Sequence, residues 1–176
     1  LSITQRSGKN IISGLATIDS FSSDTFHYER TLISAGYPLV AGLDEAGRGP
    51  LAGPVVAGCV ILPESCEFTR FKASKVLTAA KRESLYEYLH RCGASIGFAI
   101  VSPEEIDQVN ILQASLLAMA RAVAHLAAKE NKGPDFLLVD GKFTAPLELP
   151  QKALIKGESK SASIAAASII AKVVRD

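Results

Sequence analysis

Three acidic residues in this sequence stand where apolar runs end. Asp44 and Glu45 follow the apolar residues 39–43, and Asp140 follows the apolar run 136–139. Two like charges about 4 Å apart repel by roughly 4 kcal/mol at a protein-surface dielectric, and a third acid adds to that cost. A divalent cation would reverse its sign, and oxygen ligands select hard ions such as Mg²⁺ or Mn²⁺. The pattern therefore indicates nuclease or phosphoryl-transfer chemistry with two metal ions.

The prediction of a shared metal site depends on the position of these acids at the ends of strands. Open α/β sheets bind ligands beyond the ends of their strands, so Asp44 and Asp140 should meet there. Neighbouring strand residues point to opposite faces, so we expect the first strand to end at Asp44 and leave Glu45 free to join the site. A histidine base is not needed if metals activate the water. Each acid taken alone would be an ordinary loop residue.

The glycines after the acid pair have two interpretations. Gly47, Arg48 and Gly49, with residues 50–52, formally satisfy the G-x-G-x-x-A pattern of dinucleotide-binding turns. That pattern must open a helix, whereas residues 55–62 are strand-forming, so we reject it. Glycines also let backbone groups approach a ligand closely, and Arg48 adds a fixed positive charge. A plain tight turn is the alternative.

Two further stretches have the composition of phosphate sites. In "KGESKSAS" at 156–163, Lys156 and Ser159 lead into the final helix, whose first backbone N–H groups favour an anion. A simple helix cap explains these serines about equally well. Ser74 and Lys75 belong to a predicted loop, where lysines are usually only solvated.

The elements that position these residues follow from hydrophobic periodicity and from helix start and stop signals. We expect strands at 39–43, 55–62, 94–101, 136–139 and 153–155. We expect helices at about 26–35, between Thr78 and Gly93, after the capping box 102–105, at about 110–131 and at 161–176. A tight connection should join the first two strands as a hairpin. The expected architecture is an α/β layer fold with a mixed central sheet flanked by helices.

Length and composition bound the remaining questions. A chain of 176 residues with 48% hydrophobic content suits one domain, which we place at 28–176 after a mobile leader at 1–27. The net charge of +1 creates no global field for a polyanion or a membrane. Three cysteines without C-x-x-C spacing, and the lack of a long apolar run, favour a cytoplasmic protein, expected to be a monomer. The last helix lacks a stop signal, which suggests C-terminal truncation.

Several of these segments together resemble the ribonuclease HII family, the type 2 ribonucleases H. "GLDEAGRGPLAGPVVAGCVIL", "NILQASLLAM", "LLVDGK" and "KGESKSASIAAASIIAKVVRD" occur in the family's order and spacing. The resemblance implies a ribonuclease H-like fold and divalent-metal-dependent hydrolysis of RNA in RNA–DNA hybrids. It also implies cutting at ribonucleotides embedded in duplex DNA, with 5'-phosphate and 3'-hydroxyl products.

The same resemblance implies roles for individual residues. Asp44, Glu45 and Asp140 match the family's first three metal-binding acids. Glu158 falls where the family usually has aspartate, and the added methylene matters because Mg²⁺ tolerates little departure from octahedral geometry. The segment Gly47–Gly49 matches the part of the family that contacts the ribonucleotide, where reading the 2'-OH separates RNA from DNA.

Two departures keep other functions open. Ala73 stands where the family commonly has the aspartate of "DSK", and the family's junction-sensing tyrosine is not matched among residues 1–176. Together with Glu158 and the near-neutral charge, the missing tyrosine leaves a hybrid-binding fragment that no longer cleaves as one alternative. Another is a related nuclease or DNA-processing enzyme on the same fold, since fold does not fix substrate.

Overall fold

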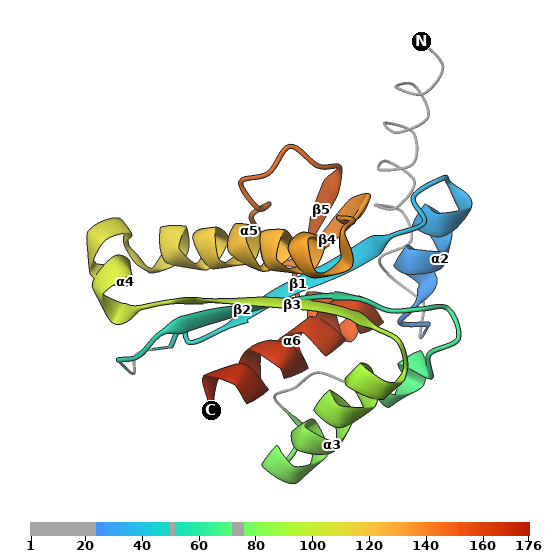
Figure 1. The fold of residues 1–176 in the computed structure, drawn as a ribbon, viewed down its shortest axis with the longest axis horizontal. Helices are drawn as coiled ribbons and strands as arrows, with labels where there is room; N and C mark the ends of the chain where they lie inside the picture. Colours follow the sequence, from blue (N-terminus) through green and yellow to red (C-terminus); the bar gives the residue numbers. More distant parts are fainter. Residues whose placement is uncertain (1–23, 50–51, 72–75) are drawn as a thin grey trace.

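A computed structural model of the chain describes residues 24–49, 52–71 and 76–176. Within these residues, five strands form one sheet in the order β3-β2-β1-β4-β5 (Figure 1). β1 (Val40–Ala46) pairs antiparallel with β2 (Val55–Ile61), which pairs antiparallel with β3 (Ser95–Val101). On its other side, β1 pairs parallel with β4 (Phe136–Asp140), and β4 pairs parallel with β5 (Gln151–Leu154). The predicted hairpin and the predicted mixed sheet are both confirmed.

Helices cover both faces of this sheet. They are α2 (His27–Ser34), α3 (Ala79–Arg91), α4 (Pro103–Val109), α5 (Ile111–Glu130) and α6 (Ala162–Arg175), with 3-10 turns at Phe68–Arg70 and Gly157–Ser159. α4 and α5 lie on one side of the sheet, whereas α3 and α6 lie on the other (Figure 1). The expected caps are present, because the Thr78 side chain accepts a hydrogen bond from the Lys81 N–H and Ser102 forms a capping box with Glu105.

α6 lies directly on the backbone of the two central strands. A Cβ added to Gly42 of β1 would stand 2.1 Å from the carbonyl carbon of Ser163, and one added to Gly58 of β2 would stand 2.3 Å from the Ala167 carbonyl oxygen. Neither glycine can therefore carry a side chain unless α6 moves away from the sheet. This close approach fixes the helix against the strand that carries Asp44.

The first strand is longer than expected. β1 continues through Asp44 and Glu45 to Ala46, because the antiparallel hairpin with β2 keeps pairing as far as Ala46 and Val56. The prediction that Asp44 closes this strand is therefore wrong. β4 does end at Asp140, and its pairing with β1 reaches only Leu43 and Val139. β1 therefore extends beyond its pairing with β4, and from Asp44 onward its edge on the β4 side has no strand partner among the described residues.

The boundary of the predicted leader also needs adjustment. Most of the leader, residues 1–23, lies outside the described residues. Residues 24–27 are packed, since Phe26 is buried and the Thr25 carbonyl oxygen accepts a hydrogen bond of 2.7 Å from the Ala162 N–H. These four residues belong with the domain.

α5 is long and apolar enough to cross a bilayer by length and composition alone. Its buried side chains, which include Ala118, Ala122 and Leu126, belong to the apolar core on its face of the sheet. α5 thus has the character of a core helix.

Candidate metal centre

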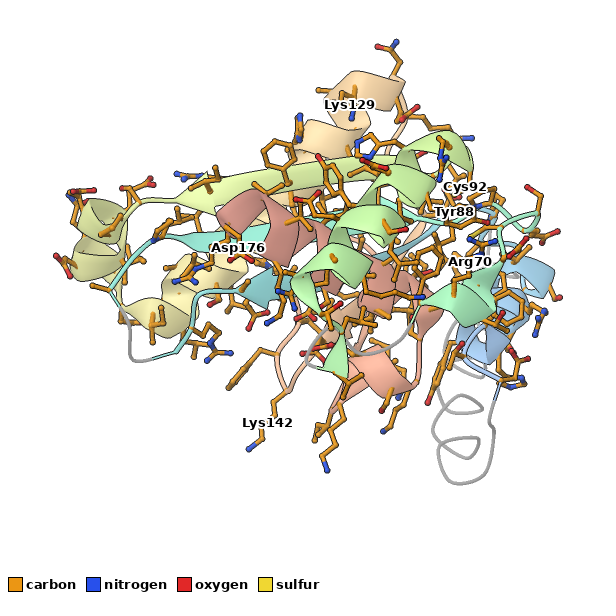
Figure 2. All side chains as sticks on the ribbon, turned by 90° about the horizontal axis from the view of Figure 1, so that it is seen from below. Arg70, Tyr88, Cys92, Lys129, Lys142 and Asp176 are labelled. Carbon is orange, nitrogen blue, oxygen red and sulfur yellow. The ribbon has the colours of Figure 1, made fainter. Side chains whose placement is uncertain are left out.

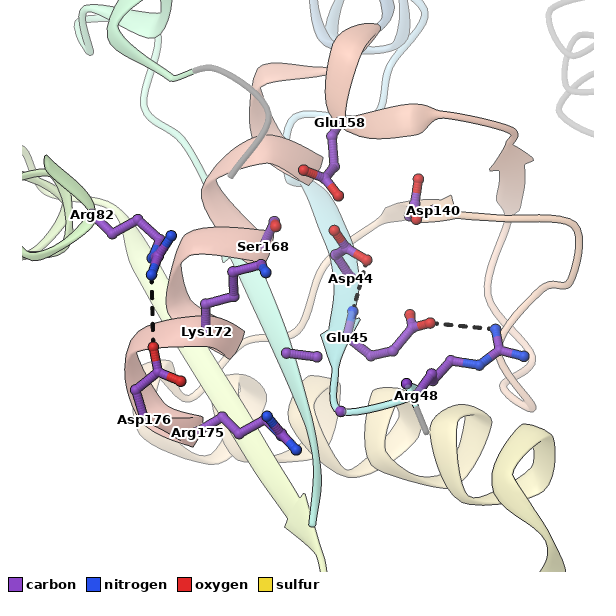
Figure 3. A pocket seen from close by; sticks show the side chains of 13 residues that line it. Asp44, Glu45, Arg48, Arg82, Asp140, Glu158, Ser168, Lys172, Arg175 and Asp176 are labelled. Atoms are coloured by element: carbon purple, nitrogen blue, oxygen red, sulfur yellow. Dashed lines mark hydrogen bonds and ion pairs between the residues drawn. The ribbon is translucent and has the colours of Figure 1, made fainter. Parts of the chain in front are cut away.

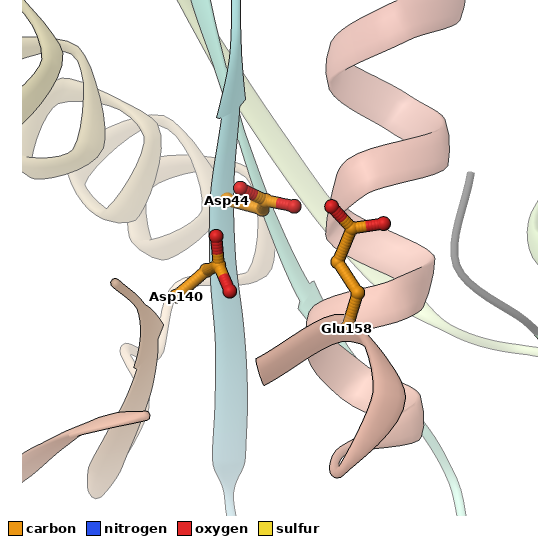
Figure 4. A group of neighbouring side chains, drawn as sticks. All are labelled: Asp44, Asp140 and Glu158. Atoms are coloured by element: carbon orange, nitrogen blue, oxygen red, sulfur yellow. The ribbon is translucent and has the colours of Figure 1, made fainter. Parts of the chain in front are cut away.

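Three carboxylates converge where the pairing of β1 with β4 ends. Asp44 comes from β1, Asp140 ends β4, and Glu158 lies in the 3-10 turn before α6. One oxygen of each lies within 4.8 Å of the others (Figure 4). The parallel register brings Asp44 and Asp140 together, because each follows directly after the paired residues Leu43 and Val139. The predicted meeting of the two strand acids is confirmed as geometry, and Glu158 joins them despite its extra methylene.

Short hydrogen bonds hold these acids in place. The Gly157 N–H donates to Asp140 Oδ1 at 2.8 Å, which ties the turn that carries Glu158 to the end of β4. A Cβ on Gly157 would stand only 3.1 Å from that same oxygen. The Glu45 N–H donates to Asp44 Oδ1, also at 2.8 Å. The backbone thus orients one oxygen of each aspartate.

The electrostatics of the cluster are unfavourable without a cation. Burial raises the pKa of the Asp44 carboxyl well above its ordinary value, and the charges of Asp140, Glu45 and Glu158 raise this pKa further. Asp44 Oδ2 is buried and has no hydrogen-bond partner among the described residues. A buried, unpartnered carboxylate oxygen beside two more acids suits a hard divalent ion, so the residues present fit Mg²⁺ or Mn²⁺.

Glu45 borders the same site but turns away from the three converging acids. Its carboxylate faces Arg48, with 3.4 Å between Glu45 Oε1 and Arg48 Nη1 (Figure 3). Burial raises the pKa of Glu45, while the Arg48 charge lowers it. The two neighbours in β1 point to opposite faces, as strand geometry requires, yet both reach one pocket because β4 ends beside them.

A pocket of about 510 Å³ is lined by these acids and by four basic side chains, those of Arg48, Arg82, Lys172 and Arg175. Figure 3 shows Arg82, Lys172 and Arg175 on the side away from Asp140 and Glu158. None of these three was among the site residues predicted from the sequence. The spacing of Ser168, Lys172 and Arg175, at i, i+4 and i+7 of the last helix, places all three on one helix face and was a usable signal. Arg82 pairs with Asp176 at 3.8 Å, a contact that only the tertiary fold creates.

The other predicted substrate residues divide into three groups. Gly47, Arg48 and Gly49 line the pocket. Lys156 and Ser159 are exposed and do not line it, and the Ser159 hydroxyl donates to the Lys156 carbonyl oxygen at 2.8 Å. Their part in binding substrate stays a prediction. Ser74 and Lys75, together with the Ala73 departure, lie outside the described residues.

The phosphate site predicted at 156–163 includes the start of α6, and there the structure places an acid of the protein itself. The carboxylate of Glu29, buried in α2, accepts hydrogen bonds from the Ser161 hydroxyl and from the Ser163 N–H at 3.3 Å. A protein side chain therefore already occupies the position where a helix N-terminus would hold an anion. Glu29 was not among the residues predicted from the sequence to belong to a site.

The family model and the related sequences that match this chain have the same description, Ribonuclease HII. A family model described as Ribonuclease HII matches residues 41–176. The chain is 55% identical over 159 residues to the Ribonuclease HII of Desulfotalea psychrophila, covering 90% of this chain and 70% of that protein. It is 54% identical over 153 residues to the Ribonuclease HII of Geobacillus thermodenitrificans, covering 87% of this chain and 57% of that protein.

The fold agrees with the sequence match. The crystal structure of ribonuclease H2 from Pyrococcus horikoshii superposes with a TM-score of 0.66 at 30% identity, covering 78% of this chain and 72% of that one. The predicted ribonuclease H-like α/β fold is confirmed.

Proposed function

The chain belongs to the ribonuclease HII family, and from this premise we propose that it is a metal-dependent endoribonuclease. Its substrates would be RNA–DNA hybrids and duplex DNA with embedded ribonucleotides. Hydrolysis of the phosphodiester would leave 5'-phosphate and 3'-hydroxyl ends. We further propose that it acts in the cytoplasm as a monomer.

The single observation that carries this proposal is the convergence of Asp44, Asp140 and Glu158 within 4.8 Å, with one Asp44 oxygen buried and unpartnered. These three side chains, with Glu45 beside them, would hold Mg²⁺ or Mn²⁺. When bound, a pair of such ions activates a water and stabilises the leaving oxygen of a phosphodiester.

The remaining residues of the pocket would bind and orient the nucleic acid. Lys172 and Arg82 supply positive charge opposite the acids, which suits the phosphate backbone of a bound strand. The Gly47–Gly49 segment exposes backbone groups at the same pocket, where they would read the 2'-OH of the ribonucleotide. Arg48 is held by Glu45 and would position the strand by its charge.

The proposal is tested with three 5'-labelled duplexes: a full RNA–DNA hybrid, DNA with one ribonucleotide, and all-DNA. We expect cleavage of the first two with Mg²⁺ or Mn²⁺, at the ribonucleotide in the second, and no cleavage of the third. Asp44→Asn and Asp140→Asn should each lower kcat more than about a hundredfold, beyond the roughly 10- to 100-fold cost of losing an outer partner of a metal site. The exposed Glu104→Gln is the charge-matched control.

The outcomes separate the competing functions. Binding of the hybrid without cleavage under every metal condition would favour a hybrid-binding fragment. Cleavage of all-DNA at a comparable rate would favour a DNA-processing nuclease. Turnover like that of the wild type in Asp44→Asn would remove these acids from the chemistry.

A further inference from the structure

Arg175, at the end of α6, reaches across to the connection between β1 and β2. Its Nε donates a hydrogen bond of 3.1 Å to the Pro54 carbonyl oxygen. The same side chain lines the pocket together with Gly47, Arg48 and Gly49. One arginine thus joins the helix that follows Glu158 to the segment that follows the acid pair.

Two glycines make room for this guanidinium. Gly47 has a φ of +103°, and a Cβ there would stand 2.8 Å from Arg175 Nε and 2.3 Å from the Pro54 oxygen that Nε contacts. Gly53 has a φ of +150°, and its Cβ would stand 3.2 Å from Arg175 Nη2. Both glycines therefore leave the space that the arginine fills. Gly49 differs, since a Cβ there would meet nothing within 4 Å.

We propose that Arg175 is a positioning residue that fixes the Gly47–Gly49 segment against the carboxylate cluster. Because the role of that segment in reading the ribose belongs to the proposed function, this inference rests on it. A guanidinium is planar and carries donors in a rigid fork, so it can hold the Pro54 carbonyl while packing between two glycines. An ammonium has neither property.

The alternative is that Arg175 serves only as a positive charge for a substrate phosphate. The conservative variant Arg175→Lys distinguishes the positioning role from the role of a simple positive charge. Arg175→Lys keeps the charge but loses the fork, so it should restore function if charge is what matters. Arg175→Met loses both charge and fork. Gly53→Ala leaves the arginine in the chain and displaces it, and serves if Arg175→Met does not fold.

A matched control comes from Arg70, which also loses one charge when changed to methionine. Its guanidinium carbon lies 4.7 Å from the centroid of the Tyr88 ring, and Figure 2 shows it well separated from Asp176 at the end of α6. Arg70 does not line the pocket. Arg70→Met should therefore leave both readouts described next unchanged.

The first readout needs no substrate: NMR order parameters of the backbone amides of Gly47, Arg48 and Gly49. In the wild type these should be close to the rigid value of about 0.85, and in Arg175→Lys, Arg175→Met and Gly53→Ala they should fall toward about 0.6. Amides of β1 and β4 should not change. Flexible values in the wild type, or unchanged values in the Arg175 variants, would overturn the proposal.

The second readout is the cleavage of duplex DNA with one ribonucleotide. Arg175→Lys and Arg175→Met should both raise KM by about tenfold, the effect of losing one hydrogen bond to a charged donor, with kcat nearly unchanged. Rescue of KM by lysine would show that charge alone matters and would refute the positioning role. If the wild type does not cleave at all, the proposed function fails, whereas the order parameters still decide the role of Arg175.

Discussion

Glu29 and Asp44 are both buried carboxylates beside α6, and each has one oxygen without a hydrogen-bond partner among the described residues. Their surroundings differ. The Glu29 carboxylate lies at the start of α6, where the Ser161 hydroxyl and the Ser163 N–H both donate to it. The Asp44 carboxylate receives the Glu45 N–H and otherwise faces the acids Asp140 and Glu158.

This contrast separates a buried carboxylate whose neighbours are hydrogen-bond donors from one whose neighbours are mainly other acids. Near Glu29 the helix N-terminus supplies donors and a favourable dipole, which offset part of the cost of burying this acid. Near Asp44 the fold gathers like charges, which lowers stability unless a cation binds. Burial raises the pKa of both groups, so the pKa direction alone would not distinguish them.

The largest expected difference between the two regions is in metal-dependent stability. At a Mg²⁺ or Mn²⁺ concentration a hundred times the Kd, the wild type should gain about 2.7 kcal/mol of unfolding free energy. For a chain of this length that raises Tm by roughly 5 to 10 °C, measured by calorimetry. Asp44→Asn should gain nothing, whereas Glu29→Gln should gain as much as the wild type. A metal-dependent gain in Asp44→Asn equal to that of the wild type would contradict the assignment of the metal to the Asp44 cluster.

A second prediction concerns Glu29 alone. Glu29→Ala removes the acceptor of two buried donors and should lower the unfolding free energy by roughly 1 to 3 kcal/mol. Glu29→Gln keeps an acceptor oxygen and places an amide where the unpartnered oxygen stood, so it should be at least as stable as the wild type at neutral pH. Urea unfolding measures both. A loss in Glu29→Gln as large as in Glu29→Ala would show that the charge itself stabilises α6.

A third prediction concerns how the stability difference between Glu29→Gln and the wild type depends on pH. Because burial raises the folded-state pKa of Glu29 above its unfolded value, its contribution to stability is fully present below about pH 4 and is lost as the pH rises. Glu29→Gln cannot ionise. The advantage of Glu29→Gln over the wild type should therefore grow from about pH 4 toward neutral pH, and a constant difference would contradict the assigned cause.

The smallest expected effect belongs to Glu158. Glu158→Asp withdraws the carboxylate from Asp44 and Asp140 by about a bond length, so kcat should change by less than about tenfold, with a different ratio between Mg²⁺ and Mn²⁺. Parallel kinetics in the two metals measure this. A loss as severe as that of Asp44→Asn would show that the 3-10 turn positions only the longer side chain.

Strand periodicity was enough to predict that Asp44 and Asp140 meet, because a parallel pair of strands brings equivalent ends together. It could not predict that β1 continues beyond Asp44, since that depends on how far the hairpin partner β2 keeps pairing. Glu158 was placed by family resemblance, and the structure brings its carboxylate to the other two acids.

The residues that sequence reasoning missed depend on packing between distant elements. Arg175 contacts Pro54, and Glu29 contacts Ser161. The residues of each pair lie far apart in the sequence, so no local sequence pattern predicts either contact. The glycines illustrate the same limit. Their number near Asp44 suggested a ligand close to the backbone, whereas Gly47 and Gly53 make space for Arg175.

The parallel pairing of β1 with β4 has a consequence for the order of folding. The β1–β2 hairpin is local and can form early, but Asp140 and Glu158 reach Asp44 only after the long β1–β4 connection has closed. Closing such a connection costs entropy before its contacts form, so this step comes late. A partly folded chain therefore lacks the carboxylate cluster, and a nascent enzyme would be unable to cut nucleic acid until its sheet is complete.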